Sequence, residues 1–542
     1  MSAKPVRRRE FLRLMGVVSA GVLASCTTQG QSSSEPTQKV GETMPVIEAT
    51  KANTEVVPSG EPDKVVIWST GDNGTVKDWA TDPILKVVEE KTNTKIEMVK
   101  IGWDTFLEQV NSSVAAGKPP DIFGVIDHNN KTQMQQWVDD GVIAAYEGAV
   151  AEAAPNVLAE YQKNPTLQEL LVNGKIYGQP ISWGDGNYPN MGLLHVRHDL
   201  LEKYNMQPPN TFEEYFNFLR AAKEDGIQGV LFSAGNGIGP AINAFTGAFG
   251  VPMIGWVRKE GKFEYWAIQP QVKEALLLFR KLVIEGLVDP TSWEDKEGKA
   301  RDMYVAGQSA SLIFNGGGHT GRIQNDMDLA GKGAKEYLLP ALEAGKGYRG
   351  YTSEPMFWGL SFLGGMKNNN PVAAARVINY LISDEGYQLT AVGVEGIDFE
   401  RDQNGEIVLL PKRTERGFPT EAGDTGAHPL ATAVVSWVPQ QWQDWALLYG
   451  KDQAYKDWYK QMWENQGKFQ IQTYGLLSTS PLWTQFQQTS SELITRNFLE
   501  IVKADSEEKA IATFDQFVKD WLANGGKDAQ DEMSEKLQAI YK

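Results

Sequence analysis

Residue types that catalyse reactions are present in this 542-residue chain, but not in the spacings that catalysis uses. There is no Gly-x-Ser-x-Gly for a nucleophilic serine, no Gly-Lys followed by Ser or Thr to hold a phosphate, and no His-Glu-x-x-His for zinc. A single cysteine excludes Cys-x-x-Cys sites. Glycines at 235, 237 and 239 lack the full dinucleotide fingerprint and are typical of a loop. We therefore expect no catalytic residue and no cofactor.

Metal binding is not expected from the histidines. His195 and His198 are three positions apart, and in a strand such residues face opposite sides, so they would not share one ion. The polar run 402–406, DQNGE, is explained more simply as a hairpin turn than as a truncated calcium loop. Paired carboxylates for glycoside hydrolysis meet only in three dimensions, so with 69 acidic residues the sequence leaves that chemistry open.

The one cysteine, Cys26, lies where an exported lipoprotein would carry it. Residues 7–9 are all arginine and residues 16–24 are small and apolar, as in a signal peptide, and this apolar run is too short to span a bilayer. The fragment RREFLR, 8–13, resembles a twin-arginine export signal, and LASC, 23–26, resembles a bacterial lipobox. We expect residues 1–25 to be removed and Cys26 to be lipidated. The alternative is an ordinary signal peptide with a chance cysteine.

Composition separates a tether from a folded part. Residues 26–62 are rich in Ser, Thr, Pro and Glu and are predicted to be disordered, which leaves about 480 residues to fold, enough for two or more domains. The net charge of −17 becomes −21 once residues 1–25 are removed, and such a surface repels nucleic acid and anionic lipid. No other apolar stretch reaches membrane-spanning length, so the lipid is the only predicted anchor. We expect a monomer on the extracytoplasmic face of the cell membrane.

The folded part begins with alternating strands and helices. The apolar runs at 65–68, 95–99 and 121–126 predict strands, and the first and third open into polar loops. Amphipathic patterns predict helices around 84–88 and over 106–116. This alternation is typical of an α/β, doubly wound parallel sheet with ligand loops at the strand ends.

A resemblance to a known family covers most of residues 64–410. The fragments follow the family order and are AAGKPPDIFGV (115–125), WVDDGVIAAYE (137–147), GKIYGQPIS (174–182), VRHDLLEKYNMQPPNTFEEYFNFLRAA (196–222), YVAGQSASLIFNGGG (304–318), YLLPAL (337–342), AAARVINYLISDEGYQL (373–389) and VGVEGIDFERDQNGEIV (392–408). Together they resemble family 1 extracellular solute-binding proteins of the maltose-binding lineage, and the last is similar to the larger LipO-like and alginate-binding-like members. The tail over 430–542 matches only in its helical character.

The resemblance implies a type II periplasmic-binding-protein-like fold with two α/β lobes, an interlobe cleft and a hinge. Lobe one would comprise 63–183 plus 338–415, and lobe two 184–337 plus 416–542. Ligand that touches both lobes would stabilise a closed form. The implied partners are a carbohydrate ligand and the transmembrane subunits of an ABC permease. Relatives with a calcium loop carry it near KEDGIQG, 223–229, which here lacks alternating oxygen ligands, so no calcium is expected.

Binding of a neutral oligosaccharide needs planar polar groups for hydroxyls and aromatic faces for sugar rings. Such side chains follow the expected strands or, by analogy with the family, border the cleft, and the ligand candidates are Asp72, Asn73, Asp127, His128, Asn129, Trp183, Asp185, Asn187, Asn236, Asn315, Glu354, Trp358, Trp437 and Trp442. The structural alternatives are helix capping by Asp72 and Asp127, a turn at Asn315, and core packing of Trp183 and Trp358. Trp68, Trp137 and Trp521 are expected to pack in the core.

Two other functions stay open from the sequence. One is a cell-surface enzyme that acts on polysaccharide, which would convert its substrate. The other is the same binding fold with a peptide or polyamine as solute, because the acidic candidates together with Trp183 would suit a cation. Anionic ligands are disfavoured, since only Lys131 lies near the candidate loops.

Overall fold

The computed structural model describes residues 60–69, 76, 78–101, 105–125, 131–234, 237–295, 299–316, 318–411, 428, 430, 445 and 448–542. Within these ranges only the backbone is described at 107, 125, 131–132, 165, 182–187, 318 and 355–358. Cys26 and the tether lie outside the described residues. None of the helices in the described part is both long and apolar enough to cross a membrane.

The chain forms two compact units, each built from separate segments. The described part of unit 1 consists of 187–354 and 451–542, and that of unit 2 consists of 60–186 and 355–450. The units change at 354/355 and 450/451, whereas the sequence expectation put these changes at 337/338 and 415/416. The first difference arises because Glu336–Leu338 pairs with a strand of unit 1.

Unit 2 is an α/β unit, and the two strands that continue into unit 1 are included here. Its elements are β1 (Asp63–Ser69), α2 (Pro83–Thr92), β2 (Thr94–Lys100), α3 (Phe106–Ala115), β3 (Ile122–Val125), α4 (Lys131–Asp139), α5 (Ala149–Glu152), α6 (Pro155–Lys163), η2 (Pro165–Leu170), β4 (Gly178–Pro189), β11 (Tyr351–Leu363), α13 (Pro371–Leu381), α14 (Asp384–Val392), β12 (Phe399–Arg401) and β13 (Ile407–Leu409). The predicted strands and helices at the start of the chain are confirmed.

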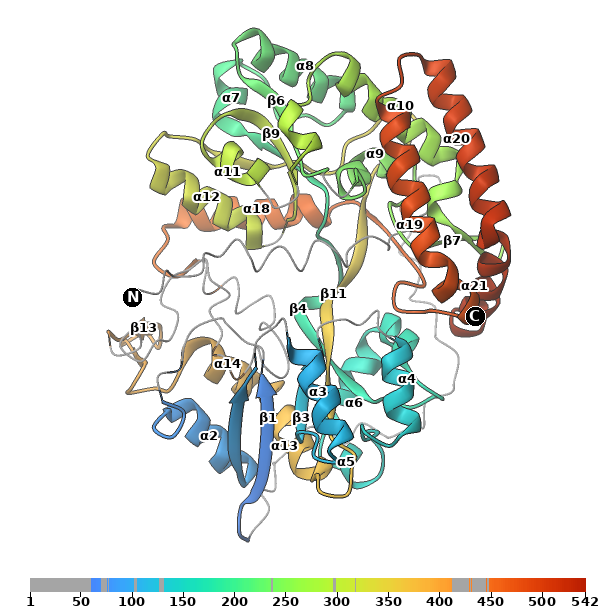
Figure 1. Cartoon of the computed structure of the whole chain (residues 1–542). Coiled ribbons are helices and arrows are strands. Elements are labelled where there is room, and N and C mark those ends of the chain that lie inside the picture. Colours follow the sequence, from blue (N-terminus) through green and yellow to red (C-terminus); the bar gives the residue numbers. More distant parts are fainter. Residues whose placement is uncertain are drawn as a thin grey trace, which may run out of the picture. The chain divides into compact units, whose positions relative to one another are not determined.

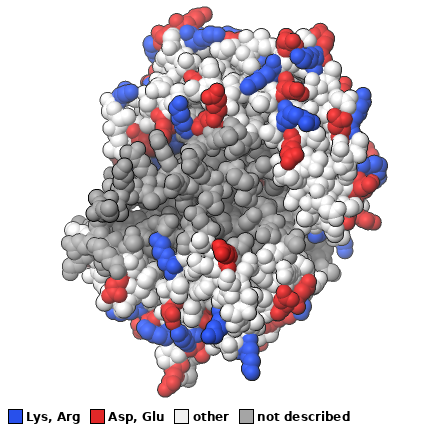
Figure 2. Space-filling view, in the orientation of Figure 1, with Lys and Arg blue, Asp and Glu red and all other residues white. Residues whose placement is uncertain are grey.

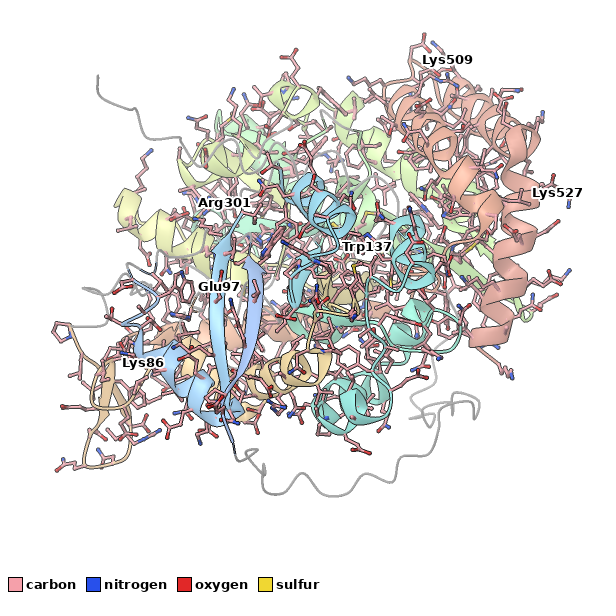
Figure 3. All side chains as sticks on the ribbon, turned by 60° about the horizontal axis from the view of Figure 1, so that its bottom comes forward. Lys86, Glu97, Trp137, Arg301, Lys509 and Lys527 are labelled. Atoms are coloured by element: carbon pink, nitrogen blue, oxygen red, sulfur yellow. The ribbon has the colours of Figure 1, made fainter. Side chains whose placement is uncertain are left out.

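The sheet of unit 2 has the order β2-β1-β3-β11, with β4 also paired to β11 (Figure 1). β1 runs parallel to β2 and β3, as predicted, and β11 returns antiparallel to β3. The ring of Trp137 on α4 lies 5.5 Å from that of Phe123 and 5.7 Å from that of Phe362, so this tryptophan packs against the sheet, as predicted (Figure 3). Asp82 starts α2 by accepting a 2.9 Å hydrogen bond from the Leu85 N–H.

Unit 1 contains a second sheet and a helical C-terminal part. Its elements are β5 (Leu193–Arg197), α7 (His198–Lys203), α8 (Phe212–Glu224), β6 (Gln228–Leu231), η3 (Pro240–Ile242), α9 (Asn243–Gly247), β7 (Trp256–Lys259), β8 (Lys262–Tyr265), η4 (Trp266–Ile268), α10 (Pro270–Ile284), η5 (Pro290–Trp293), α11 (Lys299–Val305), β9 (Ser309–Phe314), α12 (Gly318–Ala330), β10 (Glu336–Leu338), α18 (Gln453–Gly467), β14 (Gln470–Ile471), α19 (Pro481–Val502), α20 (Glu507–Trp521), η6 (Leu522–Gly526) and α21 (Lys527–Ile540).

The sheet of unit 1 has the order β10-β5-β9-β6, with β6 parallel to β9 and the other pairs antiparallel. Helices α19, α20 and α21 pack together beside the β7–β8 hairpin (Figure 1). Their apolar faces enclose Trp521, whose ring stacks 5.2 Å from that of Tyr265, so the predicted packing role of Trp521 is confirmed. Lys509 and Lys527 project outward from α20 and α21 (Figure 3).

Charged residues of both signs intermingle over the described surface of each unit in the view of Figure 2. Positive side chains are not gathered into a single patch on this face, and Asp and Glu lie among them. A basic stripe, the usual footprint of a nucleic-acid-binding protein, is therefore not seen on this face.

Candidate ligand-binding site

Two parallel strand ends lie together in unit 2. β1 ends at Ser69 and β3 ends at Val125, and these neighbouring strands are parallel, so their carboxyl ends lie at one edge of the sheet. The predicted ligand residues that follow these ends in sequence lie outside the described residues: Asp72, Asn73, Asp127, His128 and Asn129.

The other candidates divide into three groups. Asn236, Trp437 and Trp442 also lie outside the described residues. For four more only the backbone is described: Trp183, Asp185 and Asn187 on β4, and Trp358 on β11. The structure describes the side chains of Asn315 and Glu354, and both belong to unit 1. The candidate site is therefore built from unit 1.

A short loop, residues 189–192, contacts both Glu354 and the turn that contains Asn315, and we call it the Met191 loop. Its conformation depends on Gly192, which has φ +67° and whose missing Cβ would lie 1.8 Å from the carbonyl oxygen of Pro240. Glycine is required there both by the backbone conformation and by the close approach. The loop is thus packed closely against η3 and the first residue of α9.

Asn243 joins the Met191 loop to β11. Its side-chain N–H donates to the Met191 carbonyl at 2.6 Å, and its Oδ1 accepts from the Thr352 N–H at 3.1 Å and from the Thr352 hydroxyl at 2.7 Å. Asn243 is only 1% exposed, so these bonds are shielded from water and hold the two segments together. This role of Asn243 could not be predicted from sequence, because its partners Met191 and Thr352 are 52 and 109 residues away.

Glu354 lies two residues beyond Thr352 on the same strand and is 7% exposed. The Met191 N–H donates to its carboxyl group, whereas Oε1 has no hydrogen-bond partner among the described residues. Burial raises the pKa of Glu354 from 4.5 to about 8, and the Met191 N–H offsets part of that rise. At neutral pH this side chain is therefore mostly an uncharged carboxylic acid.

Asn315 occupies the turn after β9, and its side chain is half-buried. The turn is held by the Gly316 N–H, which donates to the Asn190 carbonyl of the Met191 loop at 2.8 Å. A Cβ at Gly316 would lie 2.6 Å from the side-chain amide of Gln466 on α18, so a larger residue would have to displace that side chain. Asn315 thus occupies a turn, the structural alternative expected from sequence, and the neighbouring Gly316 joins this turn to the Met191 loop.

A buried pair, His195 and Glu336, contacts the backbone of the Asn315 turn. The His195 ring lies with Nδ1 2.5 Å from Glu336 and Nε2 3.1 Å from the carbonyl oxygen of Asn315. Tyr304 donates its hydroxyl proton to the other oxygen of Glu336 at 2.8 Å. His195 is therefore engaged on both nitrogens, and the described residues contain no group of three or more His, Cys, Asp or Glu that could hold a metal ion.

Aromatic side chains complete the surroundings of the loop. The rings of Tyr188 and Trp463 lie 5.3 Å apart, and the Tyr188 hydroxyl donates to the Trp463 carbonyl at 2.7 Å. Both side chains are half-buried, and the indole N–H of Trp463 has no partner among the described residues. Gln466, one helical turn further along α18, donates its side-chain N–H to Pro189. Sequence reasoning missed Trp463, although α18 is rich in Trp and Tyr.

The Met191 loop therefore gathers a buried acid, a turn amide and an aromatic pair within unit 1. Glu354 joins it through Met191, the Asn315 turn through Asn190, and α18 through Pro189. Planar polar groups next to aromatic faces can bind sugar hydroxyls and the C–H faces of sugar rings without making or breaking a bond.

Comparison with known proteins identifies a family and several relatives. The profile of a family described as bacterial extracellular solute-binding protein matches residues 72–388. The fructooligosaccharide ABC transporter substrate-binding protein FusA of Streptococcus pneumoniae serotype 4 is 24% identical over 51% of this chain, and the match spans only 52% of that protein. The polygalacturonan/rhamnogalacturonan-binding protein YtcQ of Bacillus subtilis strain 168 is 19% identical over 98% of both chains.

A solved structure shares the fold. An HMO-binding, ABC-transporter-associated solute-binding protein from Bifidobacterium longum infantis ATCC 15697 superposes with a TM-score of 0.65, at 18% identity, over 89% of this chain and 99% of that one. The predicted fold class is thus confirmed: the chain has the two-lobe α/β fold of type II periplasmic binding proteins.

Proposed function

Because the chain belongs to the bacterial extracellular solute-binding protein family, we propose that it is the substrate-binding protein of an ABC importer and captures a carbohydrate, namely an oligosaccharide. The observation that carries the proposal is the group around the Met191 loop, where a neutral acid, an amide and two aromatic rings lie together. Two relatives, one a fructooligosaccharide transporter protein and the other a polygalacturonan/rhamnogalacturonan-binding protein, support a carbohydrate as the ligand class.

We further propose that the sugar is transferred unchanged, so the protein is not an enzyme. Glu336, a buried carboxylate linked to the Asn315 turn through His195, already accepts hydrogen bonds from His195 and Tyr304, which leaves it poorly suited to act as a proton donor or nucleophile. The transmembrane subunits of the permease are the expected partners.

A thermal-shift screen tests the ligand class. Purified residues 63–542 would be heated with a panel of neutral oligosaccharides, including kestose and maltotetraose, with uronate oligomers, and with spermidine and tripeptides. A ligand present at a hundredfold excess over its Kd stabilises the folded state by about 2.7 kcal/mol and raises the melting temperature. Shifts by peptides or spermidine, with none by any saccharide, would contradict the proposal, and product in chromatograms of the sugar mixtures would reveal an enzyme.

Lipid attachment at Cys26 is proposed from the sequence. Metabolic labelling with radioactive palmitate is expected to mark the full-length chain, and the Cys26→Ser variant should carry no label and leave the membrane fraction. Equal labelling of both chains would refute an anchor at this thiol.

A further inference from the structure

Glu354 differs from the other polar groups of the Met191 loop because its hydrogen bonding is incomplete. Asn243 and Gln466, which are equally buried, have partners within the chain. Oε1 of Glu354 has none among the described residues, although the side chain is more than nine-tenths buried. A buried polar atom without a partner costs about 1–3 kcal/mol, so in a native protein such an atom calls for an explanation.

Among the described residues, no positively charged group shifts the pKa of Glu354. On β11 its neighbour on the same face is Thr352, from the loop it receives the Met191 N–H, and at the start of α9 lies Asn243. These groups are all uncharged, and burial together with the Met191 N–H determines the pKa of the carboxyl. An ionised Glu354 would thus be a buried charge without a partner, which is strongly unfavourable.

An uncharged carboxylic acid has one O–H donor. The carboxyl group of Glu354 already accepts a hydrogen bond from the Met191 N–H, so its O–H donor is the group left to bind a ligand. We propose that Glu354 determines ligand specificity by donating a hydrogen bond from its unpartnered oxygen to an oxygen atom of a neutral saccharide. This inference rests on the proposed function and deepens it, because it selects neutral saccharide over the polyamine that the sequence left open. An ammonium group cannot accept this hydrogen bond.

The same acid would behave differently toward a cation. An ammonium ligand would draw the proton off Glu354 and pair with the carboxylate, so its affinity would rise with pH through the range in which Glu354 titrates. A saccharide that accepts a hydrogen bond from the acid loses this bond when Glu354 ionises, so its affinity falls over the same range. The direction of the pH dependence therefore distinguishes the two ligand classes.

The test is isothermal titration of the wild type, Glu354→Gln and Glu354→Ala with kestose, maltotetraose and spermidine from pH 6 to pH 9.5. Glutamine keeps the size and a neutral donor, so E354Q should bind the active saccharide within about threefold of the wild type at pH 7, whereas E354A should bind at least tenfold more weakly. With a pKa of about 8, wild-type affinity should fall roughly thirtyfold by pH 9.5, and E354Q affinity should stay flat. Glu274→Gln, an exposed position on α10, is the matched control.

Each of the other possible titration results would overturn a specific part of this proposal. Equal losses in E354Q and E354A would mean that the carboxylate acts as an ionised acceptor, and spermidine binding abolished by E354Q would establish the cation ligand. Unchanged saccharide affinity in both variants would remove Glu354 from the site while leaving the proposed function intact. Absence of binding by the wild type to either saccharide, followed by failure of the whole neutral panel, would overturn the proposed function and this inference together. Far-ultraviolet circular dichroism checks that each variant is folded.

Discussion

Replacement of Glu354 by glutamine should make the folded protein less sensitive to alkaline pH even without ligand. The pKa of Glu354 is about 8 in the folded chain and 4.5 in the reference state, so the folded state holds a proton that the unfolded state has lost between these values. Stability then falls with rising pH, by up to about 1.4 kcal/mol per pH unit. The loss is absent below pH 4.5 and complete above pH 8, where it reaches at most about 5 kcal/mol.

Urea unfolding followed by tryptophan fluorescence between pH 5 and pH 9 measures this difference, since the chain has 16 Trp residues. The stability of E354Q relative to the wild type should increase steadily over this range and level off above pH 8. Glu274→Gln should follow the wild type at every pH, because its side chain is exposed. Parallel curves for E354Q and the wild type would refute the argument that burial keeps Glu354 protonated.

Two further predictions concern packing in unit 1. Gly192→Ala should destabilise the chain by about 3 kcal/mol or more, because its Cβ would lie 1.8 Å from a backbone oxygen. The control Gly331→Ala has a similar φ of +65° but open space around the Cβ, so it should cost only about 1 kcal/mol. Equal losses of stability for the two variants in thermal unfolding would contradict the steric argument. Ser490→Ala should cost about 1–3 kcal/mol, because it removes the acceptor of the buried Trp521 indole N–H at 2.8 Å, and a change below 0.5 kcal/mol in urea unfolding would show that this bond contributes little.

The regular elements could be predicted wherever the pattern is local. The apolar periods at the start of the chain correspond to β1, α2, β2, α3 and β3, since burial of one helix face or of a strand is encoded within a few residues. The segment around Leu338 was expected to return to the first lobe, but it pairs with β5 in unit 1, and the return is made by β11. A strand's partner depends on residues far away in sequence, which its own composition does not encode.

The candidate site was predictable in part for the same reason. Asn315 and Glu354 were identified from their places near strands, but the protonation of Glu354 depends on burial and on Met191, 163 positions earlier in the chain. Asn243 and the pairing of His195 with Glu336 depend on contacts across one to two hundred residues. Trp463 could have been considered from the aromatic content of α18, although only its contact with Tyr188 connects it to the Met191 loop.

The hydrogen bonding around the Met191 loop distinguishes groups that hold the loop in place from groups that we propose to bind the ligand. Gly192, Asn243 and Gln466 act on the chain itself, by close packing or by hydrogen bonds that fix the loop in one position. Oε1 of Glu354 and the indole N–H of Trp463 lack partners among the described residues, and both adjoin this fixed loop or the helix held against it. Proteins retain such locally unfavourable groups mainly where function requires them. A rigid support beside unfulfilled hydrogen-bonding groups is what a saccharide site requires, because specificity then arises from bonds that only the correct ligand completes.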